Sequence, residues 1–153
     1  MGKKRLLTLA SAGVFGVASL VLSVGTAEAA IPSCTSWTTY DADGNPYVVH
    51  VPTVGYQTGA TYCELERGDD NDAVTVLQRA LRYCHGYQIG IDGEYGPQTE
   101  GAVRDWQQWV NGAYNAGLEE DGQWGPATRN WTQFPDWTRP GNVRTNHCEH
   151  GPS

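Results

Sequence analysis

The chain has 153 residues, of which ten are basic and 17 are acidic, and its net charge is −7. Nucleic acids and anionic surfaces repel such an acidic chain at long range, so we expect no nucleic-acid partner, and any binding to an anionic polymer must come from local contacts. The 123 residues after position 30 are enough for one compact domain and leave no room for a separate catalytic domain.

The first 30 residues predict a secretory signal peptide. Three basic residues at 3–5 precede an apolar run at 6–24, and the small residues at 27–30 form an A-x-A cleavage site. An uncleaved membrane anchor is the alternative, because the apolar run is long enough to span a bilayer. Cleavage leaves seven basic and 16 acidic residues, a net charge of −9, and no Lys, which is compatible with a high-GC actinobacterial source. We expect a secreted protein with no membrane contact after cleavage.

Residues 35–40 and 47–51 predict a β-hairpin. Both stretches are rich in Thr, Val and aromatic residues, and the sequence DADGNP between them is typical of a turn. We assign residues 31–63 to an N-terminal β extension.

Residues 70–86 predict the first helix. Asp70 or Asn71 can cap its start, and Gly86 ends it. Its buried stripe is expected to consist of Val74, Leu77, Leu81 and Cys84.

An eight-residue pattern then occurs twice, as DGEYGPQT at 92–99 and as DGQWGPAT at 121–128. The Asp-Gly pair is a turn in which Gly takes a positive φ, and Pro suits the first position of a helix. Each copy therefore predicts a turn followed by a helix start. The residues with this structural role are Asp92, Gly93, Gly96, Pro97, Asp121, Gly122, Gly125 and Pro126.

The second helix is predicted at about 97–111, because apolar residues recur there with helical spacing. The third is short and reaches Thr132 at most, since Pro135 stops it. The expected fold is mainly α: a three-helix bundle at 64–134 with an N-terminal β-hairpin extension and a disulfide-strapped C-terminal tail at 135–153.

The four cysteines predict two disulfides in an oxidising compartment. The favoured pairs are Cys34 with Cys63, which closes the N-terminal segment, and Cys84 with Cys148, which straps the tail. Pairing Cys34 with Cys148 and Cys63 with Cys84 is the alternative.

From about Leu65 to Phe134, the chain resembles the peptidoglycan-binding domain 1 family, a three-helix module attached to many bacterial wall hydrolases. The family's four motifs appear in order as RGDDNDAVTVLQ, DGEYGPQT, AVRDWQ and DGQWGPAT. The chain departs from the pattern at Asn71, where the family has Gly, at Trp106, where it has Phe, and in several additional residues near 111–117. The resemblance implies a peptidoglycan-binding-like bundle that binds the bacterial wall.

The candidate ligand contacts are aromatic residues and one Arg. Tyr95, Trp109 and Trp124 offer flat faces for sugar rings if they are exposed, although packing in the core is the commoner fate of large aromatic side chains. Arg104 can pair with a stem-peptide carboxylate.

Catalysis and metal binding have weaker support. Residues 119–121 form a carboxylate cluster, but glycosidase carboxylates come from separate elements that flank a deep cleft. The tail sequence NHCEH at 146–150 could supply zinc ligands, but the disulfide takes Cys148. We expect no enzyme activity, no metal and no cofactor.

We therefore expect a secreted, monomeric, non-catalytic module that recognises peptidoglycan muropeptides. The alternative is a protein-interaction module, such as an inhibitor or hydrolase partner, that does not bind glycan.

Overall fold

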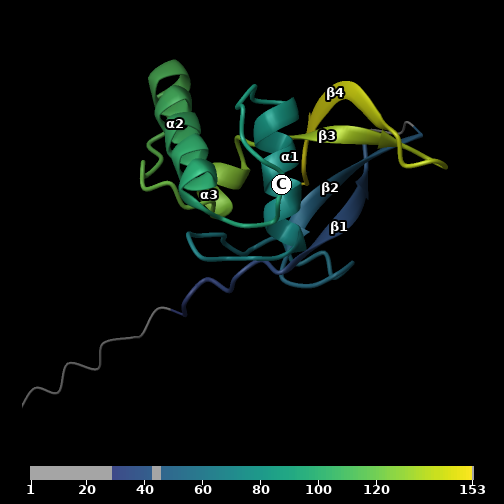
Figure 1. Cartoon of the computed structure of the whole chain (residues 1–153), viewed down its shortest axis with the longest axis horizontal. Helices are drawn as coiled ribbons and strands as arrows, with labels where there is room; N and C mark the ends of the chain where they lie inside the picture. Colours follow the sequence, from purple (N-terminus) through teal and green to yellow (C-terminus); the bar gives the residue numbers. More distant parts are fainter. Residues whose placement is uncertain (1–28, 43–45, 153) are drawn as a thin grey trace, which may run out of the picture.

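The computed structural model describes residues 29–42 and 46–152 (Figure 1). The predicted signal peptide lies outside these residues, apart from its last two positions. Among the helices of this described part, none has the length and apolar character needed to cross a membrane.

The described chain forms three helices and one four-stranded sheet. Its elements, in order, are β1 (Ser36–Asp41), β2 (Tyr47–Thr53), α1 (Asp72–Tyr83), α2 (Pro97–Tyr114), α3 (Pro126–Arg129), β3 (Gln133–Thr138) and β4 (Arg144–His150). The strands lie in the order β1-β2-β3-β4, and all neighbours are antiparallel. Figure 1 shows α1 between α2 and the sheet, and α1 contacts β1, β2, β3 and α2.

The prediction of a mainly α fold was wrong. The predicted hairpin is present as β1 and β2, but the expected C-terminal tail is a second hairpin, β3 and β4, that pairs with β2 and completes the sheet. Helix and strand contents are therefore roughly equal. The segments on either side of the helices contribute to one core, in which Val49, Val51 and Phe134 join the apolar face of α1.

Pro135 explains why the second hairpin was missed. A proline within a strand argues against a central position, because it donates no hydrogen bond to the neighbouring strand. In the structure, Pro135 pairs with Cys148 of β4, whereas the pairing of β3 with β2 covers only residues 136–138. The missing N–H therefore interrupts no bond to β2.

The three helices begin as the sequence predicts. The Asn71 side chain caps α1 by accepting hydrogen bonds from the N–H groups of Ala73 and Val74. Pro97 and Pro126 are the first residues of α2 and α3. The α2 helix extends three residues beyond its predicted end, and α3 has only four residues.

Two disulfides join the termini to the body. Cys34 is bonded to Cys63, and Cys84 is bonded to Cys148, so the structure has the favoured pairing. The second bond links the end of α1 to β4 and spans 64 positions of sequence.

Candidate functional site

A buried glutamine on α2 organises the second repeated turn. The side-chain nitrogen of Gln107 donates to the Asp121 carboxylate at 3.1 Å and to the Gln123 carbonyl at 2.9 Å. It also lies 3.1 Å from the Thr128 hydroxyl oxygen. Its carbonyl oxygen accepts a 2.9 Å hydrogen bond from the Gly122 N–H. One side chain therefore holds both the turn and the start of α3.

Gln78 on α1 makes the equivalent contacts in the first repeat. Its nitrogen donates to the Asp92 carboxylate at 2.7 Å and to the Glu94 carbonyl at 3.0 Å, and lies 3.1 Å from the Thr99 hydroxyl. Its carbonyl oxygen accepts from the Gly93 N–H at 2.9 Å. Gln78 and each residue that it contacts stand 29 positions before the equivalent residue of the second repeat. The duplication therefore includes the glutamines as well as the turns.

The two repeats also form two equivalent pockets. The first-repeat pocket has a volume of about 480 Å³ and is lined by Gln78, Gly90, Asp92, Glu94, Gly96, Pro97, Gln98 and Thr99. The second-repeat pocket has a volume of about 430 Å³, and its repeat-derived lining consists of Gln107, Glu119, Asp121, Gln123, Gly125, Pro126, Ala127 and Thr128. All eight residues of the first lining have a counterpart 29 positions later in the second.

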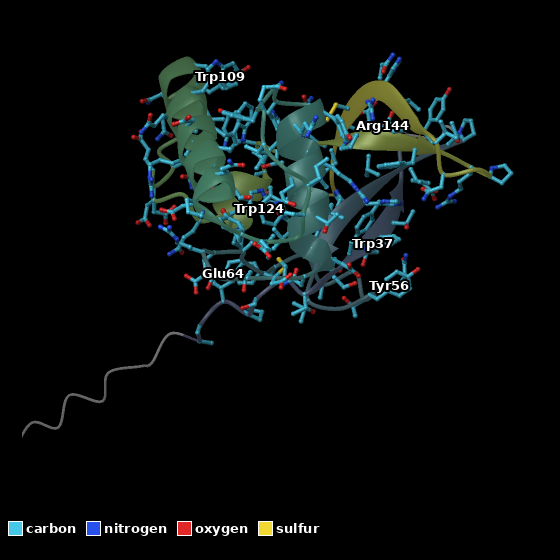
Figure 2. The ribbon with its side chains drawn as sticks, viewed as in Figure 1. Trp37, Tyr56, Glu64, Trp109, Trp124 and Arg144 are labelled. Atoms are coloured by element: carbon cyan, nitrogen blue, oxygen red, sulfur yellow. A yellow bond between two sulfur atoms is a disulfide. The ribbon has the colours of Figure 1, made fainter. Side chains whose placement is uncertain are left out.

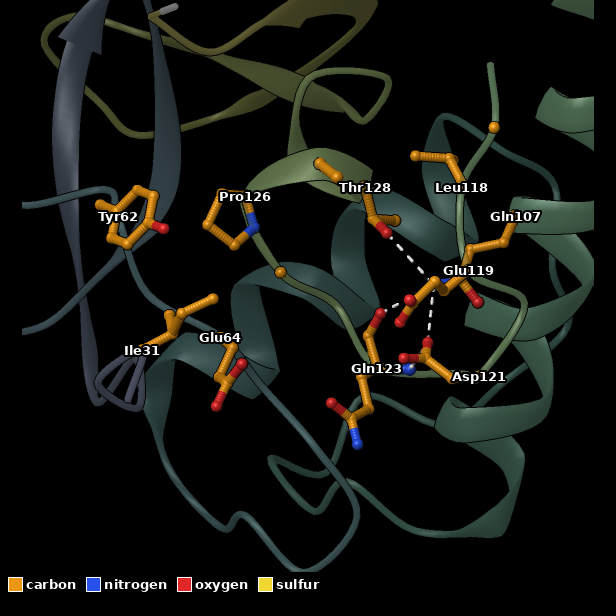
Figure 3. Close-up of a pocket in the computed structure, with 13 residues that line it drawn as sticks. Ile31, Tyr62, Glu64, Gln107, Leu118, Glu119, Asp121, Gln123, Pro126 and Thr128 are labelled. Atoms are coloured by element: carbon orange, nitrogen blue, oxygen red, sulfur yellow. Dashed lines mark hydrogen bonds between the residues drawn. The ribbon is translucent and has the colours of Figure 1, made fainter. Parts of the chain in front are cut away.

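The second-repeat pocket has additional walls. Ile31, Tyr62 and Glu64 from the N-terminal segment and Gly117 and Leu118 from the loop after α2 also line it. Figure 3 shows Ile31, Tyr62 and Glu64 on one side of the pocket and Leu118 on the opposite side. The pocket thus combines apolar walls with carboxylates, and no Lys or Arg lines it.

Backbone pairing brings Glu64 to this pocket. Leu65 and Trp124 exchange two backbone hydrogen bonds of 2.9 Å, which place Glu64 beside Gly125. Partial burial raises the pKa of the Glu64 carboxyl, and three acidic residues raise it further: Glu66, Asp69 and Asp121. The potential at this wall is therefore negative and favours a positively charged or N–H-bearing group.

Two of the four candidate ligand contacts lie in the core. Tyr95 is 1% exposed and donates its hydroxyl to the Gly122 carbonyl at 2.7 Å. Trp124 is fully buried, and its indole N–H donates to the Thr132 hydroxyl at 3.0 Å. Burial also raises the pKa of Tyr95. Neither ring offers a free face, so the packing interpretation holds for both and we do not propose them as ligand contacts.

Arg104 is already paired within the fold. Its guanidinium lies 2.7 Å from the Glu100 carboxylate and donates to the Asp121 carbonyl at 2.9 Å. The hydrogen bond from Arg104 is the main cause of the lowered pKa of Glu100. This Arg therefore connects α2 to the second turn, and a ligand carboxylate would have to compete with these partners.

Trp109 is the candidate aromatic residue that is open to solvent, with 52% of its surface exposed (Figure 2). It stacks on Trp106 at a centroid distance of 4.9 Å and meets the exposed Tyr114 edge-on at 5.7 Å. Tyr114 in turn stacks on Trp131 at 5.2 Å. We call these four residues the aromatic ridge.

The structure describes the alternative candidates for catalysis and metal binding as well. Glu119 and Glu120 are exposed in the loop before the second turn, and Glu120 accepts a 3.0 Å hydrogen bond from Asn111. Cys148 is in its disulfide, and His147 and His150 lie on β4. Within residues 29–42 and 46–152, no cluster of three or more His, Cys, Asp or Glu side chains could hold a metal ion.

Our sequence analysis missed three residues of the site. Gln78 and Gln107 stand in the LQ and WQ pairs at the same 29-residue spacing as the turns, so the spacing could have identified them. Glu64 carries no comparable signal, because its position depends on the pairing of Leu65 with Trp124.

A comparison with known protein families agrees with the motifs. Residues 70–131 match the family described as "Putative peptidoglycan binding domain", so the predicted resemblance is confirmed for this segment. The chain is also similar, at 29% identity, to a crystal structure of a peptidoglycan-binding protein from Clostridioides difficile in complex with glutamine hydroxamate. The similarity covers 60% of this chain and 53% of the other, about half its length, with a TM-score of 0.42. No curated protein matches the chain.

Proposed function

Because residues 70–131 match a peptidoglycan-binding domain family, we propose that the protein is a secreted, non-catalytic module that recognises peptidoglycan muropeptides. The family match supports a cell-wall-binding role, and the two disulfides fit an extracellular location. The observation that carries the finer proposal is the second-repeat pocket, to which segments outside the repeat add three side-chain walls at Ile31, Tyr62 and Glu64.

The lining of this pocket suits the stem peptide of a muropeptide. Its volume of about 430 Å³ falls in the usual range of small-ligand sites. Stem peptides combine Ala methyl groups, amide N–H groups and the amine of a diamino acid. The apolar walls at Ile31, Leu118 and Pro126 can contact the methyl groups, and the carboxylates of Glu64 and Asp121 can accept from the N–H groups and the amine.

The aromatic ridge, none of whose residues lines the pocket, suits the sugar part of peptidoglycan. Trp109 and Tyr114 are each more than half exposed, and exposed aromatic faces pack on the apolar faces of sugar rings. We assign glycan stacking to these two residues, and Trp109 is the candidate that remains from the sequence.

The test is titration of the purified protein with a disaccharide-tetrapeptide muropeptide by isothermal calorimetry. Glu64→Gln removes the charge but keeps the shape, and we expect about a tenfold loss of affinity, since hydrogen bonds to charged groups contribute about 1.5–3 kcal/mol. The matched control is Glu66→Gln, because Glu66 is exposed two positions away and does not line the pocket. Equal effects of the two changes would remove the pocket assignment. Absence of binding to the wild type would favour the protein-interaction module.

A further inference from the structure

The first-repeat pocket is as large as the second and is built from the same parts. Gln78 and Thr99 form its floor as Gln107 and Thr128 form the floor of the second-repeat pocket, and their nitrogen-to-hydroxyl distance is 3.1 Å in both. A Cβ added at Gly96 would meet no atom within 4 Å, whereas one added at Gly125 would lie 3.9 Å from the Glu64 side chain.

We propose that the first-repeat pocket is a second binding site for muropeptide stem peptides, so that one chain holds two stem peptides at once. This inference rests on the proposed function of the second-repeat pocket. The acceptors correspond: Asp92 takes the position of Asp121, and the Glu94 carboxylate stands where the second pocket has the neutral Gln123. As in the second pocket, no Lys or Arg lines the first.

The two sites differ in the residues that line them, and we use this difference to infer which site binds stem peptides more weakly. The first-repeat pocket has no counterpart to Ile31, Tyr62 or Glu64, because no residue of the N-terminal segment lines it. It therefore buries less of a ligand, and we infer that it is the weaker site.

Two linked sites raise the overall affinity of the protein for a polymer that carries many stem peptides. Peptidoglycan repeats its stem peptides along the glycan, so a chain held at one pocket presents the other pocket at a high effective concentration of stem peptide. Such linkage raises the overall affinity by a factor of about 10²–10⁴ when the geometry allows both sites to bind. A weak second site thus strengthens retention on intact wall more than it strengthens binding of a free muropeptide.

Matched substitutions separate the two pockets. Gln98 and Ala127 are counterparts 29 positions apart, and both are exposed in the first turn of a helix at the edge of their pockets. Gln98→Trp should obstruct the first-repeat pocket and Ala127→Trp the second. Circular dichroism and Tm establish that each variant is folded.

The experiment titrates wild type and both variants with the disaccharide-tetrapeptide muropeptide by calorimetry. We expect two ligands per wild-type chain, one per chain for each variant, and at least a tenfold loss of retention on sacculi for either variant. A wild-type stoichiometry of one, abolished by Ala127→Trp and unchanged by Gln98→Trp, would overturn the second site and leave the proposed function intact. No muropeptide binding by the wild type would overturn both.

An NMR titration of the wild type gives a result that does not depend on the variants. We expect the backbone amides of Gly90, Glu94 and Gly96 to shift with a weaker apparent affinity than those of Glu119 and Gly125. Shifts confined to the second group would contradict the second site.

Discussion

Replacing Gln107 with Leu tests whether the buried glutamine holds the second turn. The side chain is 1% exposed, and its amide makes contacts with four partners within 3.1 Å. The amide NH2 has two hydrogens and its oxygen accepts one bond, so about three hydrogen bonds are lost at a cost of about 3 kcal/mol, and the stranded Gly122 N–H, which is buried, adds about 1–3 kcal/mol. Burial of the apolar Leu side chain returns about 1.5 kcal/mol. We expect a net loss of about 2.5–4.5 kcal/mol in the free energy of unfolding.

The assay is urea denaturation at pH 7, followed by tryptophan fluorescence and far-UV circular dichroism. Gln108→Leu is the matched control, because Gln108 is the next residue of α2 and is exposed, and its change should stay within about 0.5 kcal/mol. Gln78→Leu should cost at least as much as Gln107→Leu, since Gln78 makes the same contacts and also accepts from the Asp92 N–H at 3.0 Å. If Gln107→Leu costs no more than Gln108→Leu, the hydrogen-bonded glutamine does not organise the turn.

Three further predictions concern stability. Gly122→Ala should lower the free energy of unfolding by more than about 2 kcal/mol, because Gly122 has a φ of 79° and an added Cβ would lie 2.8 Å from a backbone oxygen. The control Gly125→Ala should cost less than about 1 kcal/mol. Equal melting temperatures of the two variants would contradict this prediction. Burial lowers the pKa of His85 to about 4, so His85 takes up a proton on unfolding between pH 6.5 and 4. Wild-type stability should therefore decrease as the pH is lowered from 6.5 to 4, and more steeply than the stability of His85→Gln. Parallel pH profiles would refute the buried, neutral His85. Cys84→Ser combined with Cys148→Ser should lower the free energy of unfolding by about 2–5 kcal/mol, and an unchanged urea midpoint would show that this bond does not stabilise the fold.

The helices and turns were predictable because their signals are local. The Asp-Gly pairs indicate positive φ, and Gly93 and Gly122 have φ values of 83° and 79°. Gly-Pro marks the start of a helix, and α2 and α3 begin at these prolines. Each signal lies within a few residues of the feature that it predicts, so no knowledge of distant contacts was needed.

The sheet could not be completed from the sequence in the same way. Pairing of β2 with β3 joins Val49 to Asp136, and nothing near Asp136 indicates a partner so far back in the chain. Pro135 also argues locally against a strand. The prediction of a mainly α fold failed because the pairing of β3 with β2 and β4 stabilises a strand that Pro135 argues against locally.

The site shows the same division between local and distant information. Trp124 and Tyr95 belong to the repeat, but whether an aromatic ring is exposed depends on what packs over it, and both rings are covered. Glu64 reaches the pocket only because Leu65 pairs with Trp124. The glutamines were accessible to sequence reasoning through the 29-residue spacing, whereas the added walls of the second-repeat pocket were not.

Cosedimentation with insoluble peptidoglycan sacculi tests wall binding most directly. The protein without its predicted signal peptide (residues 31–153) is mixed with sacculi, and both its depletion from the supernatant and the release of soluble sugar fragments are measured. A non-catalytic wall-binding module predicts depletion without release, and weaker depletion for Trp109→Ala. Protein that stays in the supernatant, or soluble fragments that accumulate with time, would contradict it.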